Sequence, residues 1–140
     1  MEPQRQFWKV RHRNRFLLTI MKELAGNAHI SFEGDQKVLG LAAIQGATQV
    51  EDSVLKRNTL LPRQEFVSVP LEPSTLSPIF SKIGGTIPKS VRHILIEKNG
   101  QLEFAAYDNF HPECIFFGDA VSNAFLDVLI SEGVLKRLDS

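Results

Sequence analysis

The dipeptide Asn99-Gly100 constrains the fold of this 140-residue chain more than any other feature of its sequence. Both residues tolerate positive φ, so the pair is typical of a two-residue type I′ turn between antiparallel strands. With Lys98 opposite Gln101, the register continues as Ile96 opposite Glu103, Leu95 opposite Phe104, Ile94 opposite Ala105 and His93 opposite Ala106. One face of this predicted hairpin carries Leu95, Leu102 and Phe104, and the other carries Ile94, Ile96, Ala105 and Tyr107. Because neither face is wholly polar, we expect helices or loops to cover much of both.

The composition is ordinary for a globular protein, with 43% apolar and 23% charged residues. The length suits one domain over residues 1–140. The single cysteine cannot form an internal disulfide, which favours a reducing compartment. The chain has no apolar run of about 18 residues, and its first ten residues lack the apolar core of a secretory signal. We therefore expect a cytoplasmic protein without a membrane segment.

The net charge of zero conceals an uneven distribution of charged residues. Between Arg5 and Lys22 there are six basic residues and no acid, whereas seven acids and one lysine lie between Glu97 and Glu132. Such asymmetry concerns binding partners more than it concerns the fold.

The first segment is predicted to be a helix over residues 4–25. Apolar or small residues recur there at steps of three and four, at Phe7, Val10, Asn14, Leu17, Met21 and Leu24. Its first half is more polar, so residues 1–13 are a candidate for a separate basic helical arm. Charge runs on helices are most often solvated outer faces. The alternatives are packing against the acidic half of the chain, within one molecule or across a dimer, and nucleic-acid binding through Arg5, Lys9, Arg11, Arg13 and Arg15.

The rest of the chain mixes strand and helix patterns. Alternation predicts a strand from His29 to Glu33 and another from Glu65 to Leu71, which is near an edge because of Pro70. The short apolar run from Val38 to Ile44 fits either strand or helix by periodicity alone, and we expect it to be a strand paired with the first. Residues 45–64 fit either a short helix or a long loop. Helical spacing follows Pro73 and Ser74, and again after Asp119, which is expected to cap a last helix with Val121, Ala124, Phe125, Val128 and Leu129 inward and Gly133 at its end. This order predicts an α+β fold with a mostly antiparallel sheet that contains a central hairpin, with N-terminal and C-terminal helices packed on it.

The densest group of chemically capable side chains lies between Tyr107 and Cys114. Asp108, His111 and Cys114 have the residue types of a nucleophile, a base and an orienting group, which must lie within hydrogen-bond reach of one another. The simpler interpretation is a structural loop with a buried thiol. His111 and Cys114 supply only half of a zinc pattern, and Gly84-Gly85 follows a predicted helix where a phosphate site needs to precede one. We therefore predict no metal and no cofactor.

The leading hypothesis is a small cytoplasmic, non-enzymatic protein that acts by macromolecular binding, of the kind of a bacterial immunity or regulatory protein. Aromatic residues within an acidic patch are typical of interface hot spots. The predicted partner-binding residues are Tyr107, Asp108, Phe110, His111, Glu113 and Asp119. The partner is expected to be another protein or a second copy in a homodimer. Nucleic-acid binding through the N-terminal segment and a small hydrolase or transferase using the His111–Cys114 loop are the alternatives.

Overall fold

The computed structural model describes residues 7–34, 36–59, 61, 63–82 and 91–138, and it confirms the α+β class. A five-stranded antiparallel sheet has the order β3 (Glu65–Leu71), β2 (Ala28–Gly34), β4 (Val91–Lys98), β5 (Gln101–Ala106) and β6 (Ile115–Phe117). A separate two-stranded sheet pairs β1 (Phe7–Val10) with β7 (Leu135–Leu138). The helices are α1 (Arg13–Leu24), α2 (Leu76–Lys82) and α3 (Asn123–Ser131), and the 3₁₀ segments are η1 (Gln36–Ala43) and η2 (Pro112–Cys114).

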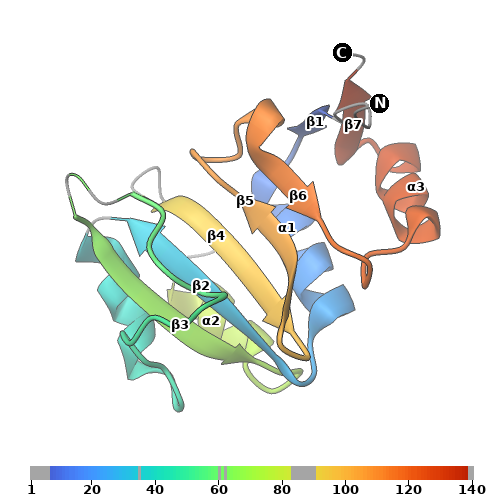
Figure 1. The fold of residues 1–140 in the computed structure, drawn as a ribbon. Coiled ribbons are helices and arrows are strands. Elements are labelled where there is room, and N and C mark those ends of the chain that lie inside the picture. Colours follow the sequence, from blue (N-terminus) through green and yellow to red (C-terminus); the bar gives the residue numbers. More distant parts are fainter. Residues whose placement is uncertain (1–6, 35, 60, 62, 83–90, 139–140) are drawn as a thin grey trace.

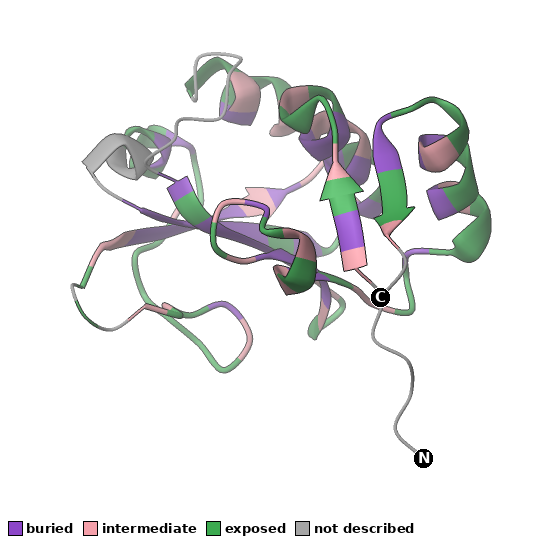
Figure 2. Ribbon diagram, turned by 90° about the horizontal axis from the view of Figure 1, so that it is seen from above, coloured by how far each residue is buried: buried purple, intermediate pink, exposed green. Residues whose placement is uncertain are grey.

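The larger sheet is covered on both faces. The helices α1 and α2 lie on one side of it and the segment between η1 and β3 crosses the other (Figure 1). The α1 side holds the main core, in which the inner face of the helix is formed by Phe16, Leu17, Ile20, Met21 and Leu24. A smaller cluster on the opposite face contains Leu55, Phe66, Leu95 and Ala105. Viewed from above, the sheet is therefore buried between two layers, as the apolar hairpin predicts (Figure 2).

The predicted hairpin forms, but its register is wrong beyond the first two pairs. Asn99 and Gly100 have φ values of 54° and 84°, as a type I′ turn requires. A β-bulge next to Ile96 then shifts the pairing, and the observed partners are Ile96 with Phe104, Leu95 with Ala105 and Ile94 with Ala106. Glu103 is the extra residue, so from Phe104 onward the two faces of β5 are exchanged relative to the prediction.

The predicted helix over residues 4–25 begins only at Arg13. Residues 7–10 form β1, which pairs with β7 from Phe7 opposite Leu138 to Val10 opposite Leu135. His12 takes a left-handed conformation with φ of 52° between strand and helix. The helical arm is thus wrong for these residues, because pairing with a distant strand overrides the local pattern. Arg5 lies outside the described residues.

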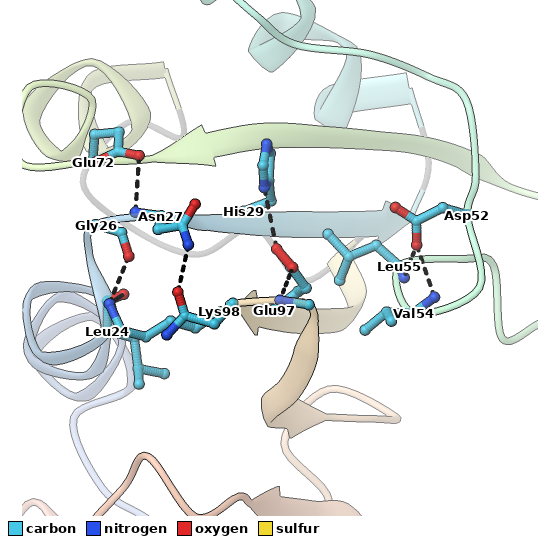
Figure 3. A network of polar contacts seen from close by, with 12 residues as sticks. Leu24, Gly26, Asn27, His29, Asp52, Val54, Leu55, Glu72, Glu97 and Lys98 are labelled. Atoms are coloured by element: carbon cyan, nitrogen blue, oxygen red, sulfur yellow. Dashed lines mark hydrogen bonds and ion pairs between the residues drawn. The ribbon is translucent and has the colours of Figure 1, made fainter.

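One further element differs from expectation, and one for which two structures were left open takes one of them. The predicted second strand from Val38 to Ile44 falls largely within η1, where Leu41 is buried. The described part of segment 45–64, for which a short helix and a long loop are both compatible with the sequence, is a loop, in which the Asp52 carboxylate accepts the backbone N–H groups of Val54 and Leu55 at 2.7 Å (Figure 3). Short apolar runs do not distinguish strand from helix, and tertiary packing decides here.

The last helix begins three residues later than predicted. Its N-cap is Ser122, whose hydroxyl accepts the Phe125 N–H, and Asp119 lies before it. The inward side chains are Leu126 and Leu129, whereas Val128 is 52% exposed. Its end at Gly133, with φ of 75°, is as predicted.

A polar network fixes the hairpin turn to the end of α1. Lys98 Nζ donates to the carbonyl groups of Leu24, Ala25 and Gly26 at 2.6–3.3 Å. This places a cation at the negative end of the helix dipole. The Asn27 side chain donates to Asn99, and the His29 ring contacts the Glu97 carboxylate at 3.1 Å (Figure 3). This end of the sheet is therefore held by groups whose partners all lie within the chain.

Candidate functional site

A cleft of about 810 Å³ lies where β6, the loop after it and α3 meet the small sheet. Its apolar wall consists of Trp8, Ile115, Phe116, Phe117, Val121 and Leu126. Its polar lining includes Tyr107, Glu113, Cys114, Asp119, Ser122 and Asn123. The cleft thus brings together three of the six residues predicted for partner binding, Tyr107, Glu113 and Asp119.

The loop before the cleft is shaped by unusual backbone conformations. Asp108, Asn109 and Phe110 have φ values of 50°, 56° and 63° in succession. This sharp turn directs Phe110 into the core, where it is 5% exposed and contacts the Phe16 ring edge-on. Burial removes Phe110 from the set of available aromatic anchors, and the neighbouring Phe116, which is 39% exposed, is the aromatic residue that faces solvent.

Trp8 supplies the far wall of the cleft. It comes from β1, far from β6 in the sequence, and its ring meets that of Phe117 edge-on with a centroid distance of 5.3 Å. The guanidinium of Arg137 lies 5.0 Å from the centroid of the Trp8 ring. The pairing of β1 with β7, which local sequence patterns do not indicate, places Trp8 here.

Glu103 and Gly118 set the course of the chain between β6 and α3. The Glu103 carboxylate is buried and accepts the Ala120 N–H at 2.7 Å, and the Gly118 N–H donates to the Glu103 carbonyl. A Cβ at position 118 would lie 2.5 Å from Glu103 Oε1 and 2.8 Å from the Leu102 carbonyl oxygen. The floor of the cleft therefore requires a glycine at position 118. The bulge at Glu103 is where the buried carboxylate binds the Ala120 N–H and fixes the chain after β6.

A buried network supports the cleft loop from behind. His93 Nδ1 accepts the Asp108 N–H at 3.0 Å, and His93 Nε2 lies 2.7 Å from the Thr59 hydroxyl. Burial lowers the pKa of His93, with Glu33 opposing this, so the neutral ring with a proton on Nε2 fits both contacts. Burial also raises the pKa of Tyr107, which keeps its phenol protonated. Histidine and tyrosine therefore act here as neutral hydrogen-bonding and packing groups.

The three residues of the predicted catalytic set make contacts within the loop between β5 and β6. The His111 Nδ1 accepts the Glu113 N–H and so caps η2. The Cys114 thiol donates to Asp108 Oδ2 at 3.9 Å, and a carboxylate is the wrong sign of charge to stabilise a thiolate. Among the described residues, no group of three His, Cys, Asp or Glu side chains is arranged to hold a metal ion. Catalysis by Asp108, His111 and Cys114 stays an untested prediction.

Two arginines of the predicted nucleic-acid surface are engaged within the chain. Arg13 donates to the Asn109 side chain at 2.9 Å and Arg15 pairs with Glu132 at 2.9 Å. These contacts join the basic N-terminal segment to the acidic C-terminal half in one molecule. Lys9 and Arg11 are exposed, and Lys9 lies opposite Lys136 in the small sheet.

Comparison with known proteins does not assign this chain to a family. No protein-family model matches the chain, and no curated protein or solved structure is significantly similar to it. Within the described part of the chain, no helix is long and apolar enough to cross a membrane. Any function is therefore argued from the site alone.

Proposed function

We propose that this protein acts by non-enzymatic binding of another protein through the cleft between β6 and α3. The observation that carries the proposal is the convergence of Trp8 and Phe116 with Tyr107, Glu113 and Asp119 around one open cleft. Its finer form is a regulatory or immunity-type protein of the cytoplasm, the compartment that a single cysteine favours.

The chemistry of the lining suits a protein partner. Exposed aromatic surface rimmed by polar groups is a common mark of interaction sites, and aromatic residues dominate the binding free energy of many interfaces. Phe116 supplies exposed apolar surface, and Glu113 and Asp119 supply negative charge beside it. Carboxylates at the rim of an interface select partners of opposite charge and accelerate their association.

The proposal is tested by capture with the purified protein as bait. The variant Glu113→Lys/Asp119→Lys reverses the charge of the cleft, and the control Glu23→Lys/Asp127→Lys makes the same change in net charge at exposed positions that do not line the cleft. We expect one nuclease-resistant partner to be retained by wild type and by the control, and to be lost with the cleft variant. Equal capture by all three proteins would contradict the proposal.

Nucleic-acid binding has one observation in its favour. The exposed Lys9 and Lys136 lie opposite each other, with exposed Arg11 following β1. Directly opposed like charges destabilise a pair of strands unless an anion neutralises them. Binding of this kind predicts a steep loss of affinity with salt, which Lys9→Gln/Lys136→Gln would make shallower. Absence of a gel shift at low salt would exclude it.

A further inference from the structure

The two edges of the five-stranded sheet are finished differently. At the β3 edge, the outward backbone groups of Ser68 are both bonded to Thr48, at 2.8 and 2.9 Å. Pro70 has no N–H, and its carbonyl accepts the Thr75 hydroxyl at 2.7 Å. This edge is therefore closed to further strands at Ser68 and Pro70, which is how many proteins prevent edge-to-edge association.

The β6 edge has no such cover within the described part of the chain. On its inner side, the Tyr107 N–H donates to the Cys114 carbonyl and the Gly118 N–H donates to the Glu103 carbonyl. In an antiparallel ladder, alternate residues direct their backbone groups to opposite sides. Ile115 and Phe117 therefore direct their N–H and C=O groups away from β5, and both residues line the cleft.

We infer that the cleft receives an extended basic segment of a partner protein, which adds to β6 as a sixth strand. This inference rests on the proposed function and specifies its partner. Main-chain hydrogen bonds to Ile115 and Phe117 would supply affinity, as in other complexes formed by strand addition. Phe116, which is 39% exposed, offers an apolar surface to side chains of the added strand, whereas Trp8, which is 6% exposed, packs edge-on against Phe117 and backs the cleft.

Charge identifies the class of segment. Glu113 precedes β6 and Asp119 follows it, and the described lining residues include no lysine, arginine or histidine. The strand Ile115–Phe117 lies between these two carboxylates in the sequence, so a short extended segment that pairs with it has its ends near the two acids. A basic residue near each end, with β-branched or aromatic residues between them, matches the lining in charge and in strand propensity.

The probe is a displayed library of random linear heptapeptides, selected on wild-type protein and counter-selected on Glu113→Lys/Asp119→Lys. We expect enriched sequences to alternate apolar and polar residues and to carry lysine or arginine. Selected peptides are then synthesised with N-methyl groups on alternate amides. Methylation of the amides that face β6 is expected to lower affinity at least tenfold, whereas methylation of the intervening amides is expected to leave it within about threefold, because these face solvent.

Hydrogen exchange gives a readout that side-chain binding would not produce. The amides of Ile115 and Phe117 are expected to gain protection when peptide binds, whereas that of Phe116, which faces β5, serves as the internal control. Trp8 is the sole tryptophan, so its fluorescence reports occupancy of the cleft directly.

The outcomes separate this inference from the proposed function. Peptides that bind the cleft equally well with either methylation pattern, without protecting Ile115 and Phe117, would overturn strand addition and keep the binding function. Failure to enrich any peptide over the cleft variant would overturn the inference as well. The proposed function fails in a different experiment: it is contradicted if the Glu113→Lys/Asp119→Lys variant still captures the partner protein from lysate.

Discussion

The β2–β3 half of the sheet and the β5–β6 half differ in where their polar groups and apolar surfaces go. In the first half, the buried Glu33 carboxylate accepts the N–H groups of Asn58 and Thr59, and Thr48 closes the β3 edge. In the second half, Phe116 is partly exposed and the outward groups of Ile115 and Phe117 face a cleft. The polar groups of the first half have partners within the chain, whereas the second half has one strand edge beside the exposed ring of Phe116, and this difference is the basis of the proposed binding role.

The largest expected change in stability comes from removing the Glu33 carboxylate, which binds the loop that covers the β2–β3 half of the sheet. Glu33→Ala leaves the amides of Asn58 and Thr59 without their charged acceptor, which we expect to lower the free energy of unfolding by about 3 kcal/mol. Urea denaturation measures it, with the exposed Glu23→Ala as a control expected to change stability by less than about 0.5 kcal/mol. Equal stability of the two variants would show that the loop does not need this anchor.

The next largest change in stability is expected in the β5–β6 half of the sheet. Gly118→Ala places a Cβ against Glu103 and the Leu102 carbonyl, and we expect a loss of about 1–3 kcal/mol from the resulting overpacking. Gly40→Ala is the matched control, since a Cβ there meets no atom within 4 Å. Thermal unfolding compares the two, and a Gly118→Ala protein as stable as Gly40→Ala would contradict the close approach described for the cleft floor.

A smaller, pH-dependent effect links the two halves through His93. Burial lowers the pKa of His93 in the folded protein, so its neutral form is favoured by folding. Its contribution to stability is therefore complete above the unfolded pKa of about 6.5 and is lost as the pH falls from there through the lower folded pKa. We expect His93→Gln to reduce the loss of stability between about pH 7.5 and pH 5. If the free energy of unfolding changes with pH in the same way in His93→Gln as in wild type, His93 does not cause this pH dependence.

The smallest expected change in stability is that of Phe116→Lys, at the exposed ring beside the open edge. Substitution of a partly exposed residue is expected to alter stability by no more than about 0.5 kcal/mol. A lysine on an edge strand opposes the addition of another strand, and it places positive charge beside Glu113 and Asp119. We therefore expect lost partner capture with normal denaturation. Retained capture would exclude Phe116 from the binding surface.

The hairpin, the β3 strand with its edge proline and the helices after residues 74 and 119 could all be predicted, because turn chemistry and periodicity are local. The bulge at Glu103 could not, since it depends on the carboxylate reaching the Ala120 N–H after β6. The conversion of residues 7–10 from helix to strand depends on a partner strand at the opposite end of the described chain.

The sequence indicates only those residues of the candidate site that lie close together along the chain. Tyr107, Glu113 and Asp119 lie near one another in sequence and were found by composition. Three successive left-handed residues turn the ring of Phe110 inward, and the pairing of β1 with β7 brings Trp8 to the cleft. Residues brought together by chain reversal or by long-range pairing leave no trace in a sequence window.

The pairing of β1 with β7 has a consequence for the order in which the molecule is made. β7 is the last described element to leave the ribosome, and pairing across so long a loop carries the largest closure entropy in the fold. During synthesis the five-stranded sheet can form first, while Trp8 still lacks the strand that fixes it beside Phe117. The wall of the cleft that Trp8 supplies is therefore expected to form after the five-stranded sheet.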